Sequence, residues 1–344
     1  MSKQVSESDF NRQIVSNYTD VAGEKLGGKV LSFSDEWFAE AANLIKPYAP
    51  IREAGKFVDS GAWYDGWETR RHNTEPADWV VCRFGVAAAH IVGTEIDTAY
   101  FNGNHAPEIS VECTSITSGL NEADEAAALK SASWDTVISK HECGPSQKQF
   151  FVLDKPTSKT YTHARLNMYP DGGIARFRLY GSVVPDFSQS KDVEIDLASV
   201  LNGGQAVARS DQHFGSADNL LLPGKGENMG SGWETKRSRE PGHVDWVVIR
   251  LGAPGTINKI VLDTAWFKGN FPQKMTVSAV NLKPGESIAA DDDRWVEVLA
   301  PVQGAPHVEK EYPVDNKHVF SHVKLTIIPD GGVSRIRVFG NRAE

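Results

Sequence analysis

The stretch SGAWYDGWETRRHN (60–73) returns later in the chain as MGSGWETKRSR (229–239), with Gly232 in the place of Gly66. Four other segments occur twice in the same order: SDEWFAEAANLI (34–45) and SDQHFGSADNLL (210–221); DWVVCRFG (78–85) and DWVVIRLG (245–252); DTAYFNGN (97–104) and DTAWFKGN (263–270); PDGGIARFRLYG (170–181) and PDGGVSRIRVFG (329–340). This unit is far longer than the roughly 20 to 50 residues of solenoid and propeller repeats. The chain therefore carries two copies of a whole domain.

The boundaries of the two copies follow from a polar, proline-bearing segment, VVPDFSQSKDV (183–193), which has the composition of a linker. We predict an N-terminal extension over 1–26, a first repeat over 27–184 and a second over 192–341. A chain of 344 residues is long enough to build two hydrophobic cores.

Within a copy, apolar and polar residues alternate with the period of a β-strand. In GGIARFRLYG (172–181), for example, Ala175, Phe177 and Leu179 share one face. Pro-Asp-Gly-Gly between two such runs predicts a hairpin turn. Regular short strands with Gly and Pro between them predict an all-β sandwich or jelly roll. Helix is expected near the ends and after Ser34 or Asp35, either of which can cap EWFAEAANLI, and 118–133 is expected to be an exposed insertion.

Composition excludes several classes of protein. A net charge of −9 argues against general binding to nucleic acid. No apolar run is long enough to span a membrane, and the start, MSKQVSESDF, lacks the apolar core of a secretory signal. Cys82, Cys113 and Cys143 are scattered and odd in number, so they form no disulfide framework or zinc motif. We expect a reduced, cytoplasmic protein without nucleic-acid or membrane partners, and a homo-oligomer because sandwich edges invite association.

Several long motifs carry a resemblance to a known family. LGGKVLSFSDEWF, GAWYDGWETRRHN, ECGPSQ and YPDGGIARFRLYG resemble the allantoicases, and the similarity extends from about Gly27 to Gly340. The resemblance implies two tandem galactose-binding-like jelly-roll β-sandwich domains. It also implies a hydrolase of C–N bonds in a linear amidine-type substrate, which converts allantoate to ureidoglycolate and urea during the breakdown of purines through allantoin.

That chemistry asks for particular side chains. The substrate carboxylate calls for a guanidinium, and the ureido N–H groups call for carboxylate, amide or backbone acceptors. Urea leaves poorly as an anion, so its nitrogen must gain a proton, and a base must remove a proton from the attacking water. The catalytic candidates are Asp35, Glu68, His72, Asp97 and His105. The substrate-binding candidates are Arg70, Arg71, Asn102, Asn104, Arg176, Glu234, Lys236, Arg237 and Asp263.

Each candidate also has a structural alternative. The acids and bases of the Gly-Trp-Glu-Thr motif can form ion pairs, the Asp of DTAYF and DTAWF can hold a turn, and the Asn-Gly segments are typical of turns. Arg176 can lie on a solvated strand face or in an inter-sheet ion pair. The four repeated tryptophans are expected in the core: Trp67, Trp79, Trp233 and Trp246.

The two copies differ in their histidines. His72 and His105 belong to the first copy, whereas Ser238 and Phe271 stand in the matching places of the second. We therefore predict that the first copy is the better catalytic candidate. The sequence motifs identify no cofactor. A divalent metal held by these two histidines with Asp35 and Glu68 stays open, although no HxH or HExxH pattern supports it.

Two alternatives to this assignment stay open. Cys143 is a conceivable nucleophile, but the second copy has no counterpart, and a structural thiol is favoured. The chain could also be a non-catalytic tandem carbohydrate-binding module, which the jelly roll and nine tryptophans permit. The recurring acid–base cluster favours the hydrolase, and release of urea from allantoate separates the two functions.

Overall fold

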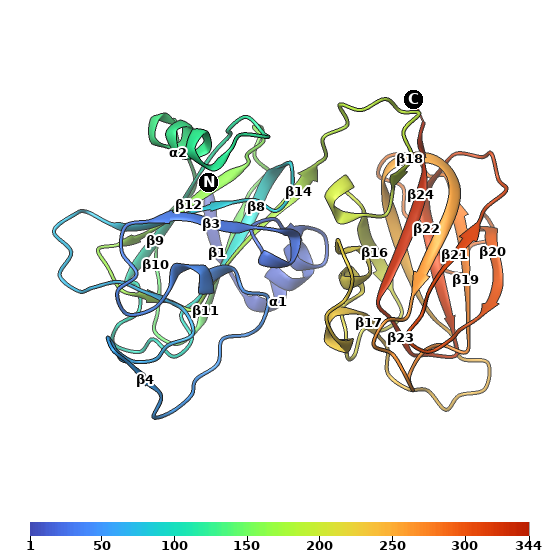
Figure 1. The fold of residues 1–344 in the computed structure, drawn as a ribbon, viewed down its shortest axis with the longest axis horizontal. Helices are drawn as coiled ribbons and strands as arrows, with labels where there is room; N and C mark the ends of the chain where they lie inside the picture. Colours follow the sequence, from blue (N-terminus) through green and yellow to red (C-terminus); the bar gives the residue numbers. More distant parts are fainter. Residues whose placement is uncertain (344) are drawn as a thin grey trace. The chain divides into compact units, whose positions relative to one another are not determined.

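The computed structural model describes residues 1–343 and divides into two compact units, Met1–Val184 and the chain from Pro185 onward. Nearly all regular structure in both is β-strand, and the paired strands are antiparallel (Figure 1). The predicted fold class, two tandem β-sandwiches, is confirmed. None of the helices in the described residues is both long and apolar enough to cross a membrane.

The first unit is built from two five-stranded sheets. One has the order β1 (Ser2–Val5), β11 (Lys148–Leu153), β8 (Ala88–Asp97), β14 (Arg176–Val184), β2 (Thr19–Asp20). The other has the order β10 (Asp135–Glu142), β9 (Glu108–Thr114), β12 (His163–Tyr169), β7 (Asp78–Arg83), β3 (Lys29–Phe33). Both contribute fully buried side chains to the core, such as Ile96 and Phe177 from the first sheet and Val111 and Leu166 from the second.

Residues 1–26 take part in the first sandwich. They supply β1 and β2, and the short helix α1 (Glu7–Phe10) buries Phe10 on the outer side of the sheet. The Phe10 ring lies 5.0 Å from the ring of Phe150 and 5.4 Å from that of Tyr180. The N-terminal segment therefore covers apolar surface that the repeat alone would leave exposed.

In the second unit, one long strand, β18 (Asp245–Asp263), corresponds to both β7 and β8 of the first unit. Its first part pairs with β22 (Phe320–Ile328) and its last part with β24 (Arg335–Arg342). The remaining strands of this sheet are β15 (Ile195–Asp196), β16 (Gln205–Arg209), β19 (Lys274–Val280), β20 (Val296–Gln303) and β21 (Glu309–Pro313) (Figure 1).

The prediction of a hairpin turn at Pro-Asp-Gly-Gly is wrong. The strand before it, β12, lies in one sheet, and the strand after it, β14, lies in the other, so the segment crosses between the layers. Gly172 has a φ of +144°, and a Cβ there would lie 2.7 Å from the backbone oxygen of His105. Glycine is needed because this crossover packs directly against the neighbouring loop.

The helices also differ from expectation. Ser34 and Asp35 cap no helix, because their side chains bond to β7 and to Arg70 instead. Only a 3₁₀ turn forms in the predicted segment, over Ala41–Ile45. The insertion at 118–133 contains a helix, α2 (Glu122–Ser131), whose N-terminus is capped by the side chain of Asn121.

Candidate active site

The repeated tryptophan anchors the GWETRR motif. In β6 (Trp67–Glu68), which pairs with β13 (Gly173–Ile174), Trp67 is fully buried, and its Nε1 donates to the backbone oxygen of Asp35 at 2.7 Å. In β17 (Trp233–Glu234), which pairs with β23 (Gly332–Val333), Trp233 does the same to Asp211 at 2.8 Å. The predicted core position of these two tryptophans is confirmed. Their packing holds the polar residues that follow at the loop end of each sandwich.

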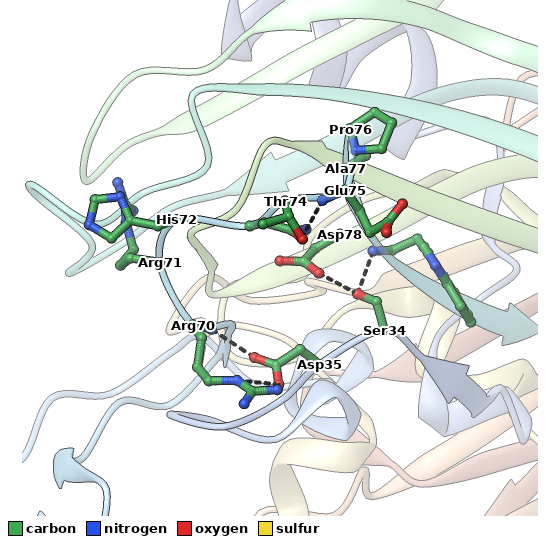
Figure 2. Close-up of a pocket in the computed structure, with 12 residues that line it drawn as sticks. Ser34, Asp35, Arg70, Arg71, His72, Thr74, Glu75, Pro76, Ala77 and Asp78 are labelled. Carbon is green, nitrogen blue, oxygen red and sulfur yellow. Dashed lines mark hydrogen bonds and ion pairs between the residues drawn. The ribbon is translucent and has the colours of Figure 1, made fainter.

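Asp35 binds Arg70. One carboxylate oxygen accepts the backbone N–H of Arg70 at 2.7 Å, and the other lies 3.1 Å from Nε and 2.9 Å from Nη2 (Figure 2). The Arg70 side chain is 66% exposed, so solvent screens this pair. Asp35 thus uses both oxygens to position Arg70.

Asp171 holds Arg71, a partner that the sequence did not reveal. The carboxylate of Asp171 lies 3.0 Å from Nε of Arg71, and its other oxygen accepts the backbone N–H of Asn73. Within residues 1–343, the two terminal NH₂ groups of Arg71 have no hydrogen-bond or ion-pair partner. Arg71 is therefore oriented through one edge of its guanidinium and offers the other. The signal was present in the repeated Pro-Asp-Gly-Gly, whose aspartate the pattern identified only as a turn residue.

Glu68 pairs with Asn104, whose Nδ2 donates to Oε1 at 2.6 Å. Burial raises the pKa of Glu68, while the Asn104 hydrogen bond and the positive charge of Arg71 act in the opposite direction. A carboxyl group with a raised pKa keeps its proton closer to neutrality, as a general acid must. Glu234 and Asn270 repeat this bond at 2.5 Å in the second unit.

Asp97 and Asp263 have structural tasks. Each is buried and accepts the backbone N–H two residues ahead, from Ala99 at 2.8 Å and from Ala265 at 2.7 Å. Burial raises the pKa of Asp97, although hydrogen bonding to Ala99 opposes it. The turn-holding alternative accounts for the geometry of both residues.

Arg176 is also committed to structure. It is 3% exposed, its Nη2 lies 2.6 Å from the carboxylate of Asp65, and its Nε donates to the backbone oxygen of Tyr48. Nη1 donates to two further backbone oxygens, those of Asp65 and Ala175. A buried ion pair thus accounts for this arginine, which has no free edge for a substrate.

A cavity of about 600 Å³ opens beside these groups (Figure 2). It is lined by Ser34, Asp35 and the segment from Arg70 to Trp79. This arrangement brings Asp35, Arg70, Arg71 and His72 together. Trp79 lines the cavity and is only partly buried, as is Trp246, so the prediction that these two lie in the core is wrong.

Glu68, Asn102, Asn104 and His105 lie outside that lining. They belong to a neighbouring loop cluster in which the backbones of Glu68 and His105 both pair with Gly173. Nδ1 of His105 lies 3.1 Å from the backbone oxygen of Asn102, and Asn102 itself is exposed. The sequence predicts one cleft shared by Asp35, Glu68 and His105. In the structure, Asp35 lines the cavity, and Glu68 and His105 lie in the neighbouring loop cluster.

The second unit keeps the acids and changes the cations. Asp211 accepts the backbone N–H of Lys236 at 2.7 Å, and Asp330 accepts that of Ser238 at 2.8 Å. The side chains of Lys236 and Arg237 form no ion pair with any residue up to position 343. Two basic groups at this end are therefore free of internal partners.

The histidine–carboxylate set proposed for a divalent metal does not fit one. Asp35 is occupied by Arg70, and Glu68 by Asn104. Among the described residues, no group of three or more His, Cys, Asp or Glu side chains is arranged to hold a metal ion.

Comparison with known proteins identifies relatives along the whole chain. A family model described as "Allantoicase repeat" matches residues 19–184 and again 195–343. An allantoicase of Neurospora crassa is 54% identical over 99% of this chain and 96% of its own length, and one of Saccharomyces cerevisiae is 55% identical over 97% of each. The crystal structure of allantoicase from Saccharomyces cerevisiae, 51% identical, covers 99% of this chain and 100% of the other with a TM-score of 0.84.

Proposed function

The chain belongs to the allantoicase family, and we propose that it hydrolyses a C–N bond of allantoate to give ureidoglycolate and urea. The observation that carries this function is the similarity of both repeats, over nearly the full length, to relatives named allantoicase. In finer terms, the bond is a non-peptide C–N bond of a linear amidine-type substrate. A cytoplasmic location and a homo-oligomeric state remain predictions.

We place the substrate carboxylate of the first unit on Arg71. Its Nε is held by Asp171, and its two NH₂ groups are free, which is the geometry of a guanidinium ready to form two parallel bonds to a carboxylate. Arg70 has already given Nε and Nη2 to Asp35, so it supplies positive charge at the cavity instead. Lysine at position 71 would offer a single point charge.

Glu68 is placed as the proton donor to the leaving nitrogen. Glu68 and Arg71 follow the same anchored Trp67, so we place one ureido group of a substrate held by Arg71 beside Glu68 and Asn104. As the C–N bond breaks, the bonding electrons and the Glu68 proton pass to the ureido nitrogen and form neutral urea. The lone pair of the remaining ureido nitrogen stabilises the electron-deficient carbon, and water then adds to this carbon to give the hydroxyl of ureidoglycolate. His72 or His105 accepts the proton that the water loses, and this proton returns to Glu68 through solvent.

The test is release of urea from allantoate by the purified protein. A non-catalytic carbohydrate-binding module would release none. The variant Glu68→Gln keeps a group of the same size and removes the proton, so it should lower kcat by about 10²-fold or more. The matching Glu234→Gln measures what the same change does in the second unit. Equal, small effects in both would contradict the assignment of Glu68.

A further inference from the structure

The two units treat one buried arginine differently. Arg176 and Arg335 occupy matching positions at the start of β14 and β24, and they are 3% and 5% exposed. In the first unit, Nη1 of Arg176 donates to the backbone of Asp65 at 2.8 Å, and in the second, Nη1 of Arg335 donates to the backbone of Ser231 at 2.6 Å. The guanidinium groups are therefore held in the same way along this edge.

The carboxylate that neutralises Arg176 is missing around Arg335. Asp65 precedes Gly66, and Ser231 precedes the matching Gly232, so the second unit has a serine where the first has its ion-pair partner. Among residues 1–343, Arg335 forms no ion pair, and its Nε has no hydrogen-bond partner. The buried guanidinium thus lacks the ion pair of its counterpart, and its Nε–H lacks an acceptor, which is costly unless something else accepts that hydrogen bond.

The preceding residue, Ser334, carries a second unsatisfied donor. Ser334 is fully buried, its Oγ has no partner among the described residues, and the first unit has Ala175 in its place. A Cβ on Gly226 would lie 2.6 Å from this oxygen and 3.7 Å from Nη1 of Arg335, so both groups sit beneath the same loop. The second unit has therefore lost an acceptor and gained a donor at one place.

Charges of both signs surround Arg335, and Arg337 among them is paired with Asp196 at 3.6 Å. Burial and the neighbouring Arg337 lower the pKa of Arg335 to about 10, and the negative charges of Asp263 and Glu227 partly oppose this. Arg335 therefore stays fully charged at neutral pH. A guanidinium N–H and a hydroxyl beneath one loop are complementary to the oxygens of a small carboxylate.

We propose that Arg335 and Ser334 form a binding site for a small carboxylate in the second unit, at the position that the first unit fills with Asp65. The ligand class rests on the proposed function, since the substrate and its product are both ureido carboxylates. The site binds the ligand carboxylate through charge-assisted hydrogen bonds and carries no reaction step. The first unit cannot bind a ligand in this way because its own side chain occupies the place.

Entry requires movement of the loop 223–232, which covers the site. This segment contains four glycines, Gly224, Gly226, Gly230 and Gly232, and the Nε1 of Trp266 donates to the backbone oxygen of Gly226 at 2.6 Å. Glycine-rich backbone changes conformation at low cost. The hydrogen bond from Trp266 holds the loop over the site.

The experiment measures binding of N-carbamoylglycine, which has the carboxylate and one ureido group, by isothermal titration calorimetry. Ser231→Asp places the carboxylate of the first unit into the second and should weaken or abolish one binding component by about 10- to 100-fold, the effect of a lost charged hydrogen bond. Ser334→Ala copies the residue of the first unit, so it is expected to fold normally, and should weaken the same component about two- to tenfold.

Asn228→Asp is the matched control. It adds the same charge to the same loop at an exposed residue that serves as a helix cap, where aspartate is equally suitable, and binding should stay near that of the wild type. The proposal is overturned if Asn228→Asp weakens binding of the probe as much as Ser231→Asp does, because the loss of affinity would then come from long-range charge repulsion.

Two other results overturn it as well. In one, Ser334→Ala and Ser231→Asp both bind the probe like the wild type. In the other, the wild type binds no probe, because water alone completes the site. Urea release by the wild type is measured separately, so loss of this site and failure of the proposed function are distinguishable.

Discussion

Replacement of Arg71 by lysine tests the assignment of the substrate carboxylate. Arg71 keeps two free NH₂ groups, and lysine would leave one ammonium in their place. Loss of one charged hydrogen bond costs about 1.5 to 3 kcal/mol. At about 1.4 kcal/mol per factor of ten, kcat/KM for allantoate should fall at least about tenfold and at most a few hundredfold.

The same change should have little effect on stability. Asp171 is 3% exposed, but lysine keeps a positive charge within reach of it, and Arg71 itself is 42% exposed, so the exchange should cost no more than the roughly 0 to 1 kcal/mol of an ion pair open to solvent. In a unit of this size that corresponds to a shift in Tm of about 4 °C or less. A purely structural ion pair predicts the opposite result, namely a lower Tm and normal turnover by the protein that remains folded.

The control is Arg237→Lys, which makes the identical exchange at the matching place of the second unit. Arg237 has no ion-pair partner within residues 1–343, and if the first unit carries out turnover its replacement should change kcat/KM less. Urea release across a range of allantoate concentrations and thermal unfolding are measured on both variants. An unchanged kcat/KM in Arg71→Lys refutes the carboxylate assignment, and equal losses in both variants refute the asymmetry between the units.

Three further outcomes are expected. Burial raises the pKa of Glu68, so Glu68 loses its proton only as pH rises through that raised value, and activity that needs the protonated form should fall on the alkaline side. Asn104→Ala removes a hydrogen bond that lowers this pKa, so it should move the alkaline fall in a kcat–pH profile to higher pH. Replacing Asp65 by alanine leaves the buried Arg176 unpaired and should destabilise the first unit by about 3 to 5 kcal/mol in denaturant unfolding, whereas a loss below 1 kcal/mol would contradict the buried pair. Burial raises the pKa of Cys143 to about 12, so Cys143→Ala should retain full activity, and a maleimide should not label this thiol in the native protein.

Much of the fold follows from local patterns. Duplicated motifs require two similar domains, and alternation in segments such as 172–181 requires strands with one buried face. The burial of Trp67 and Trp233 could also be predicted, because large apolar groups in repeated strands favour a core. Trp79 has the same surroundings in the sequence but lines a cavity, since whether a strand face is covered depends on segments far away in the chain.

The sequence predicted which residues the candidate site contains better than it predicted which of them form ion pairs with one another. Asp35, Arg70, Arg71 and His72 do meet at one cavity, because they lie on segments that flank the same anchored tryptophan. The partner of Arg71 could not be predicted, because Asp171 approaches only when the chain crosses from one sheet to the other.

The sequence by itself determined the duplication, the β-sandwich class and the inventory of charged groups, because these depend on residue order and short-range periodicity. Only the tertiary structure decided which charges are neutralised. Asp65 and Arg176 are 111 positions apart and meet through closure of the sandwich, while Arg335, in the same kind of strand, is left without a carboxylate. Hydrogen bonds and ion pairs act over a few ångströms, so their partners are set by how distant segments pack together and not by spacing along the chain.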